Sequence, residues 1–161
     1  MVKLAMSEHI AVVQWQRNEA KFIDRQYSRE HVWKFDGGAE ILASPSPHVV
    51  PIPYSNPAGV DPEEAFIASL SSCHMLWFLA IAAKKKFLVN SYQDRAIGLL
   101  SKGENGQLAI TRVNLHPQII FAEDNLPTAK QIEEMHEEAH RSCFIANSVK
   151  TEIIIEGLRK C

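Results

Sequence analysis

The chain has 161 residues, of which 46% are hydrophobic and 22% charged, and its formal net charge is −2. This length predicts one domain over residues 1–161 with a substantial core, and the composition is that of an ordinary soluble globular protein. Because the charge is near neutral and no basic stripe interleaves with aromatic residues, nucleic acid is excluded as an expected partner.

The cysteines and the N-terminus predict a protein of the reducing cytoplasm. Three widely spaced cysteines, an odd number, do not form the disulfide framework of a secreted domain. No N-terminal stretch combines a basic start, an apolar run and a small-residue cleavage site, so we expect no secretory signal. The longest strictly apolar run, residues 75–83, is far below the roughly 18 to 20 residues that span a bilayer. We therefore expect no membrane partner.

The first 60 residues predict strands followed by a rigid loop. Residues 9–16 are rich in β-branched and aromatic residues, and residues 27–36 and 39–43 predict a hairpin with a Gly-Gly turn. Residues 44–59 hold five of the eight prolines. Long ordered loops of this kind are often functional.

One long helix is predicted over residues 61–87. Asp61 suits the N-cap, and a proline follows at the first helical position. Between residues 66 and 83 nearly every side chain is apolar or small, with no polar stripe. This pattern is typical of a helix that is buried all round. Cys73 and His74 lie in the middle of that length.

The rest of the chain predicts two strands, a helix and a closing strand. Residues 92–102 and 107–122 are expected to be the strands, and residues 129–142 form a capped helix with one apolar face. Residues 149–156 alternate and suggest the last strand. The order strands, helix, strands, helix, strand predicts an α+β fold with an antiparallel sheet packed against helices.

Two cysteines about 70 residues apart are the leading candidates for chemistry. Cys73 and Cys143 each belong to a core-facing helix, so the fold could bring them together. If they meet, the natural interpretation is a peroxidatic thiolate that is oxidised to a sulfenic acid and a resolving thiol that condenses with it to a disulfide. The alternative is that each cysteine is a small core residue. Cys161, at the chain end, is expected to be inert.

A thiolate at Cys73 needs a positive group nearby, because it lies about three turns inside its helix, beyond the dipole of the N-terminus. Glu63 is the carboxylate that we favour to hold this cation, although helix-start electrostatics also explains it. Ten residues of continuous helix separate Glu63 and Cys73 by about 15 Å. Either the helix is broken between them or a cation reaches between the two. The candidate cations come from the second strand region and from two histidines: Arg29, Lys34, His31 and His74.

Histidines suggest two further interpretations. His48 in the loop and His74 beside the cysteine are candidate substrate-pocket residues, or each is a satisfied structural histidine. The run His136-Glu137-Glu138-Ala139-His140 matches H-E-x-x-H, in which two histidines bind zinc and the glutamate acts as base, with Cys143 close by as a third ligand. Because the stretch is rich in Glu and His, a solvated helix face is favoured over a zinc hydrolase.

Two stretches carry a family resemblance: DPEEAFIASLSSC, which begins the long helix, and HRSCFIANSVKTEI near the end of the chain. Both resemble the OsmC/Ohr family, named for osmotically inducible and organic hydroperoxide resistance proteins. The spacing of ten residues between the first Glu and the Cys is fairly specific. The resemblance covers about residues 27–156 and leaves residues 1–26 as an N-terminal extension.

The resemblance implies an intertwined homodimer, with curved antiparallel sheets wrapped around two long central helices and active sites at the subunit interface. Cys73 then matches the peroxidatic cysteine, Cys143 the resolving cysteine, and Glu63 the glutamate that pairs with an active-site arginine. Arg29 is the nearby arginine that we assign to that role. The implied reaction reduces organic hydroperoxides to alcohols with electrons from a dithiol, often lipoyl-linked, and uses no metal or prosthetic group.

This chain departs from the family pattern in the loop of residues 44–59, which lacks an arginine and contains His48. His74 after the cysteine is a second departure, so the chain resembles a divergent OsmC-like branch. The first hypothesis is a cytoplasmic, thiol-dependent hydroperoxide reductase. The alternative is a redox sensor or small-ligand-binding dimer that uses the same pocket without rapid turnover.

Overall fold

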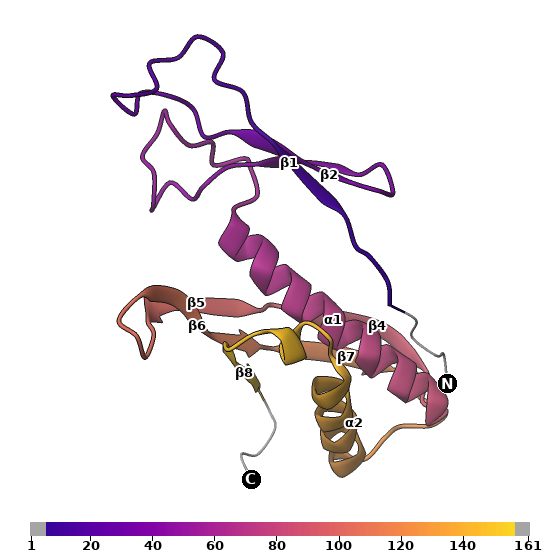
Figure 1. Ribbon diagram of the computed structural model, residues 1–161. Coiled ribbons are helices and arrows are strands. Elements are labelled where there is room, and N and C mark those ends of the chain that lie inside the picture. Colours follow the sequence, from indigo (N-terminus) through magenta and orange to yellow (C-terminus); the bar gives the residue numbers. More distant parts are fainter. Residues whose placement is uncertain (1–5, 157–161) are drawn as a thin grey trace. The chain divides into compact units, whose positions relative to one another are not determined.

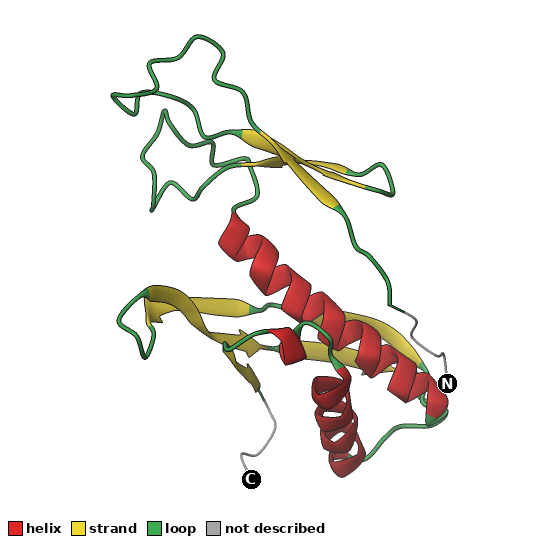
Figure 2. Cartoon of the chain, viewed as in Figure 1, coloured by secondary structure: helices red, strands yellow, loops and turns green. Residues whose placement is uncertain are grey.

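The computed structural model describes residues 6–156, which form two compact units drawn in Figures 1 and 2. The first unit ends at Pro62 and the second begins at Glu63. The first contains three strands: β1 (Ala11–Gln14), β2 (His31–Phe35) and β3 (Glu40–Ala43). The second contains two α-helices, one short 3₁₀ helix and five strands. In chain order these are α1 (Pro62–Lys84), β4 (Val89–Asp94), β5 (Ile97–Lys102), β6 (Leu108–Leu115), β7 (Pro117–Phe121), α2 (Ala129–Ser142), η1 (Ala146–Ser148) and β8 (Glu152–Ile155). The first residue of α1, Pro62, is also the last residue of the first unit.

The first unit is an antiparallel sheet with the strand order β1-β2-β3. Its hairpin confirms the prediction from the sequence. The turn between β2 and β3 is closed by the N–H of Phe35, which donates to the carbonyl of Ala39, and by the N–H of Gly38, which donates to the carbonyl of Phe35, both at 3.0 Å. Gly38 has a φ of 86°, a conformation that glycine adopts without a Cβ clash.

The proline-rich loop of residues 44–59 is tied to this sheet by hydrogen bonds. The N–H of Val60 donates to the carbonyl of Leu42 at 3.0 Å, and the N–H of Ser44 donates to the carbonyl of Val60 at 3.1 Å. The Ser44 hydroxyl also accepts the N–H of Asn56 at 2.8 Å. The loop is therefore an ordered part of the first unit and more than a linker.

The strands of the second unit form two sheets, one of β4 and β7 and one with the order β5-β6-β8. The prediction of single strands over residues 92–102 and 107–122 is wrong, because each of these segments breaks into two strands that belong to different sheets. The Asp94 carboxylate, at the end of β4, accepts the N–H of His116 at 2.6 Å. His116 lies between β6 and β7, so this hydrogen bond joins the two positions at which the chain changes sheet.

The expected closing strand is present as β8, but it pairs with β6 in parallel. The prediction of a purely antiparallel sheet is therefore wrong at this edge. A parallel partner needs a long crossover connection. The chain between β6 and β8 supplies one, since it passes through β7, α2 and η1 before it returns.

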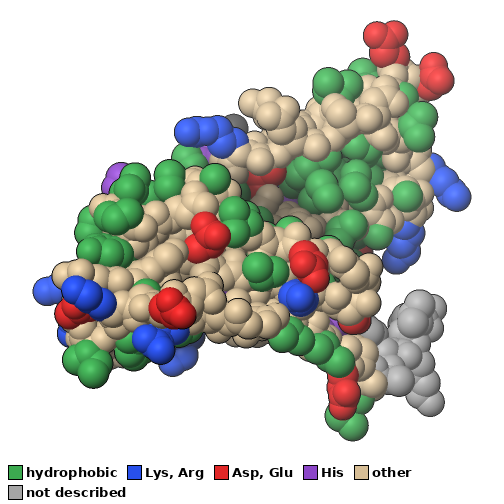
Figure 3. Space-filling view, turned by 90° about the horizontal axis from the view of Figure 1, so that it is seen from above, with side chains coloured by type: hydrophobic (Ala, Val, Ile, Leu, Met, Phe, Trp, Pro, Cys, Tyr) green, Lys and Arg blue, Asp and Glu red, His purple; other side chains and the backbone are tan. Residues whose placement is uncertain are grey.

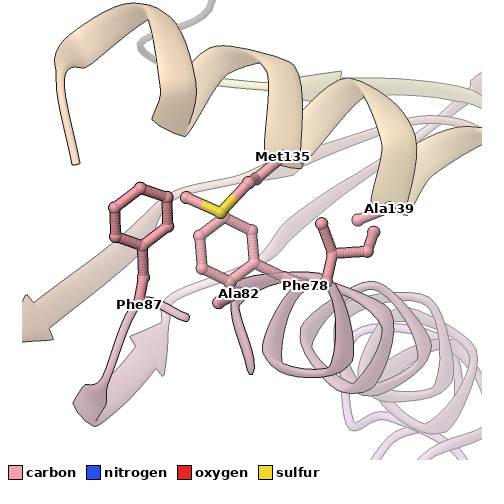
Figure 4. Packing of buried hydrophobic residues seen from close by; sticks show 6 residues of the cluster. Phe78, Ala82, Phe87, Met135 and Ala139 are labelled. Atoms are coloured by element: carbon pink, nitrogen blue, oxygen red, sulfur yellow. The ribbon is translucent and has the colours of Figure 1, made fainter. Parts of the chain in front are cut away.

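Two hydrophobic clusters hold α1 against the rest of the second unit. Figure 4 shows the first, in which Phe78 and Ala82 of α1 meet Met135 and Ala139 of α2 and the side chain of Phe87. The second cluster packs an earlier part of α1 against the sheet β5-β6-β8. Its buried members are Leu70, Val113, Leu115 and Ile155.

Only one face of α1 is buried within the described part of the chain, so the prediction of a helix buried all round is wrong for these residues. The buried residues share one stripe: Leu70, His74, Phe78, Ile81 and Ala82. Leu76 is 60% exposed, and hydrophobic side chains reach the surface on the face drawn in Figure 3. By length and hydropathy α1 could also cross a membrane, a test that the core helix of a soluble protein passes as well.

The ends of the two helices are set by local hydrogen bonds. Lys86 has a φ of 66°, and the N–H groups of Lys86 and Phe87 donate back to the carbonyls of Ala83 and Ala82. This is a Schellman C-cap, with a lysine at the position that glycine usually takes. The predicted cap of α2 is confirmed, because Thr128 forms a capping box with the third helical residue.

Candidate functional site

Two thiols from different helices meet in the second unit. Cys73 lies in the middle of α1 and is partly exposed, whereas Cys143 is the C-cap of α2 and is 1% exposed. Their side chains lie close enough to affect one another's ionisation, and both cysteines are free thiols. The sequence-based expectation that the fold brings these two residues together is therefore confirmed as geometry. Cys161 lies outside the described residues.

The turn after α2 positions Cys143 and contacts its sulfur. The N–H of Ala146 donates to the Cys143 Sγ at 3.4 Å, and the N–H of Asn147 donates to the Cys143 carbonyl at 3.0 Å. Burial, followed by the hydrogen bond with Cys73, raises the pKa of Cys143 to about 11. Cys143 is therefore a protonated thiol at neutral pH, able to donate its S–H to the Cys73 sulfur.

Glu63 lies in the first turn of α1 and is partly exposed. Because α1 is continuous from Pro62 to Lys84, the alternative of a broken helix between Glu63 and Cys73 is wrong. At about 1.5 Å of rise per residue, the carboxylate is roughly 15 Å along the axis from the thiol. Glu63 does not touch Cys73 directly, and a role for it requires an intermediate cation.

Arg29 belongs to the first unit, where its guanidinium is held by an aromatic clamp. Its carbon lies 3.9 Å from the centroid of the Tyr27 ring and 5.6 Å from that of Tyr54. The Nη1 donates to the carbonyls of Tyr27 at 2.6 Å and Arg25 at 3.0 Å. The ion pair with Glu63, which belongs to the second unit, stays a prediction. His48 is also in the first unit and is exposed.

Two other candidate cations have partners within the first unit. His31 accepts the Nε1–H of Trp33 at its Nε2, at 2.9 Å, and its Nδ1 lies 2.7 Å from the Arg29 carbonyl. Both ring nitrogens of His31 are thus engaged within that unit. Lys34 pairs with Glu40 at 3.2 Å. Lys34 is therefore already engaged by a carboxylate of its own unit.

His74 is buried at the contact between α1 and α2. Its Nε2 lies 2.9 Å from the Nδ1 of His136, and the two rings stack with centroids 5.2 Å apart. Burial lowers the pKa of His74 to about 4 and that of His136 to about 3, so both are neutral at pH 7. With 1% of its surface exposed, His74 fits the structural interpretation better than the pocket interpretation, and it is not a cation for the thiolate.

The zinc interpretation of residues 136–140 is wrong. His136 is directed at His74 in the interior, whereas Glu137 is exposed and lies 3.9 Å from Arg141. Residues 6–156 contain no group of three or more His, Cys, Asp or Glu side chains that could hold a metal ion. His136 and Glu137 thus lie in different surroundings, which a match of the sequence pattern does not detect.

A cavity of about 500 Å³ lies along α1 away from the thiols. It contains neither cysteine, and helical periodicity puts its residues of α1 on the side opposite Cys73. It is lined by side chains of α1, β4 and the segment after β4: Glu64, Ile67, Ala68, Ser71, Ser72, Met75, Tyr92, Asp94 and Ala96. The thiol contact and this cavity are thus separate features of the second unit.

The sequence analysis missed an aromatic pair beside the thiols. Trp77 and Phe144 form an edge-to-face contact with ring centroids 5.5 Å apart and an interplanar angle of 90°. The signal was present in the sequence, since Trp77 follows Cys73 by four residues on a helix and Phe144 follows Cys143 directly. Once the two cysteines meet, their aromatic neighbours are brought close as well.

Comparisons with known proteins find a family match and similar solved structures. The family described as OsmC-like protein matches residues 55–156. An OsmC-like protein of unknown function from Vibrio cholerae is 58% identical, with a TM-score of 0.92, and the match covers 94% of this chain and 99% of that one. No curated protein matches the chain.

More distant structures share the fold. An organic hydroperoxide resistance protein from Elizabethkingia anophelis is 19% identical with a TM-score of 0.68, and the match covers 94% of each chain. The organic hydroperoxide resistance protein OhrB of Bacillus subtilis is 17% identical with a TM-score of 0.63, covering 96% of this chain and 100% of that one. At these identities the likeness shows the α+β fold alone.

The buried histidine pair predicts a loss of stability in mild acid. The pKa values of both histidines are lower in the folded chain than the ordinary 6.5. Below pH 6.5 the unfolded chain therefore binds more protons than the folded chain. The free energy of unfolding falls as the pH drops from 6.5 towards 4. Each histidine contributes up to about 2 kcal/mol of this loss by pH 5. Urea unfolding at pH 7, 6 and 5 measures it.

The matched variants are His136→Gln, which removes one of the titrating groups, and His9→Gln, which removes an exposed one. We expect His136→Gln to have a clearly smaller difference between pH 7 and pH 5, and His9→Gln to keep the parental difference. An unchanged pH dependence in His136→Gln would contradict the assignment.

Proposed function

The chain belongs to the OsmC-like protein family, and from that premise we propose that it is a thiol-dependent peroxidase that reduces organic hydroperoxides to alcohols. The observation that carries the proposal is that the side chains of Cys73 and Cys143 lie close together. A partly exposed thiol beside a buried second thiol is the arrangement that peroxide reduction with a resolving cysteine requires. The relation of the family to organic hydroperoxide resistance proteins supports it.

The first step oxidises Cys73. Its thiolate attacks the terminal oxygen of the hydroperoxide, the O–O bond breaks, and the departing alkoxide takes up a proton to give the alcohol. Cys73 is left as a sulfenic acid, which carries the transferred hydroxyl group. Before attack, the S–H of Cys143 stabilises the Cys73 thiolate by hydrogen bonding, because the raised pKa of Cys143 keeps that thiol protonated.

The second step forms a disulfide. The Cys143 sulfur displaces the hydroxyl group from Cys73, and this group leaves with the Cys143 proton as water. A dithiol reductant, for which a lipoyl-linked dithiol is our proposal, then reduces the disulfide by exchange and becomes a disulfide itself. In sum, one hydroperoxide and one dithiol give one alcohol, one water and one oxidised dithiol, with no metal or prosthetic group.

We assign Arg29 as the cation that favours the Cys73 thiolate and Glu63 as the carboxylate that orients it. The assignment to Arg29 follows from the family resemblance, which pairs the glutamate of the first helical turn with an arginine. His48 and His74 are left without an assigned step.

We further propose that two copies of the chain form a homodimer in the cytoplasm, with the active sites at their interface. Exposed apolar side chains of the second unit support this partner, since exposed apolar surface is what an interface buries. Leu76 on α1 is 60% exposed, and Leu99 and Leu100 on β5 are 52% and 47% exposed. A second copy that covers α1 would give the helix the all-round burial that its sequence predicts.

Replacement of Cys73 by Ser abolishes peroxide turnover in this account, because no other thiol performs the first step. Steady-state consumption of cumene hydroperoxide with dihydrolipoamide as reductant measures it. Cys161→Ser is the matched control and should keep the parental rate. Full activity in Cys73→Ser refutes the mechanism, and negligible turnover by the parent favours the alternative of a redox sensor or ligand-binding dimer.

Replacement of Cys143 by Ser should allow one turnover per subunit and then stop, because the sulfenic acid has no partner with which to condense. In a Cys161→Ser background, dimedone labelling detected by mass spectrometry should find the adduct on Cys73. Sustained turnover by this variant at the parental rate is the result that would remove Cys143 from the mechanism.

Replacement of Arg29 by Met should slow the oxidation of Cys73 by about tenfold or more, because the thiolate would lose the positive group that this account requires. The rate of iodoacetamide alkylation at a fixed pH, in a Cys143→Ser and Cys161→Ser background, measures the reactivity of Cys73 directly. Lys34→Met, which removes a cation already paired with Glu40, is the control. An alkylation rate that does not change excludes Arg29 as the activating cation.

A further inference from the structure

A hydrogen bond between two buried histidines joins the helices that carry the thiols. His74 is 1% exposed and His136 is 4% exposed, and the Nε2 of His74 lies 2.9 Å from the Nδ1 of His136. The two rings are nearly parallel, with an interplanar angle of 5°. Burial lowers their pKa values to about 4 and about 3, so both rings are neutral at pH 7 and one nitrogen donates to the other. The contact is therefore directional.

This histidine pair is close to both thiols along the chain. His74 directly follows Cys73 on α1, and His136 precedes Cys143 by seven residues on α2. Seven residues are about two helical turns, so His136 and Cys143 lie on about the same side of α2. A shift of α2 along α1 that breaks the histidine hydrogen bond therefore also moves Cys143 relative to Cys73.

The apolar part of the same contact does not by itself fix the position of α2. Phe78 of α1 and Met135 and Ala139 of α2 belong to one hydrophobic cluster, and the hydrophobic effect is non-directional. A buried polar pair behaves differently, because a partner that loses its hydrogen bond is left unsatisfied away from water, at a high cost in free energy. The histidine pair thus selects one position of α2 on α1.

The position of α2 matters for the second of the two proposed steps. Oxidation of Cys73 needs only that thiolate and the hydroperoxide. Disulfide formation needs the two sulfurs within bonding distance, in a geometry that tolerates Cα separations of only about 4.4–6.8 Å. A small displacement of α2 is therefore felt in the second step and not in the first.

We propose that His136 is a positioning residue for disulfide formation: its hydrogen bond with His74 holds Cys143 where it condenses with oxidised Cys73, and this protects Cys73 from overoxidation. The inference rests on the proposed peroxidase function. A sulfenic acid that persists reacts with a second hydroperoxide, which transfers one oxygen atom and becomes its alcohol, and Cys73 becomes a sulfinic acid. Rapid condensation with Cys143 prevents this reaction.

His136→Leu removes the hydrogen bond and keeps a buried apolar side chain. In a Cys161→Ser background we expect it to slow disulfide formation by about tenfold or more, because a misplacement of about 1 Å costs up to roughly a hundredfold, and to leave the oxidation of Cys73 within about twofold of the parent. Rapid mixing with one equivalent of cumene hydroperoxide, acid quenching and mass spectrometry measure the sulfenic acid and the disulfide separately. With excess hydroperoxide, the variant should accumulate sulfinic acid on Cys73.

Two further variants separate positioning from general stability. His136→Asn carries an amide close to the position of the Nδ1 and should restore disulfide formation to near the parental rate. Val113→Ala is a change in the second hydrophobic cluster, which lowers stability without touching the histidine pair, and it should keep the parental rates of both steps. Thermal unfolding confirms that each variant is folded. Should His136→Leu not fold, His136→Gln replaces it, because its amide is carried one carbon further and should resolve more slowly than that of His136→Asn.

The outcomes separate this inference from the function on which it rests. A parental rate of disulfide formation in His136→Leu, or equal rates in His136→Asn and His136→Gln, overturns the positioning role and leaves the peroxidase intact. Equal slowing of both steps also overturns it, since His136 would then support the fold generally. Absence of turnover in the parent refutes the proposed function itself, and the positioning role with it.

Discussion

The packing of α2 against α1 is the interaction on which the rest of this structure depends. Met135 and Ala139 of α2 close over Phe78 and Ala82 of α1, and the hydrogen bond between His74 and His136 joins the same two helices in the interior. Because Cys73 and Cys143 are carried on these helices, the fit of apolar side chains and one neutral polar pair brings together two thiols that are 70 residues apart in the chain. The chemistry proposed for the site is thus a consequence of core packing.

The contact gives the two thiols different environments. Cys143 is buried and its pKa is raised to about 11, whereas Cys73 is partly exposed on α1. A protonated donor beside an accessible sulfur stabilises negative charge on that sulfur, and the donor is itself the group that must later form the disulfide. Trp77 of α1 and Phe144, which follows Cys143, also meet edge to face, so the contact between α1 and the end of α2 includes both thiols and an aromatic pair.

Most helices, strands and turns could be predicted from the sequence, because the residue patterns that determine them are local. The long apolar run, the Gly-Gly turn and the capping residues before α2 fix where elements begin and end, and the spacing of Glu63 and Cys73 carries the family resemblance. The breaks near Asp94 and His116 could not be predicted, because they depend on a hydrogen bond between distant segments. The parallel pairing of β8 and the burial of His136 against His74 are likewise set by tertiary contacts, and for that reason the zinc motif was misleading.

The most direct test of the central claim is the identity of the disulfide that forms in the first turnover. The reduced protein is treated with one equivalent of cumene hydroperoxide per subunit, its remaining thiols are alkylated, and the non-reduced digest is mapped by mass spectrometry. The account predicts that the peptide with Cys73 is linked to the peptide with Cys143 and that Cys161 is alkylated. A Cys73 that is recovered as a free, alkylated thiol, or that is linked to Cys161 instead, would contradict it.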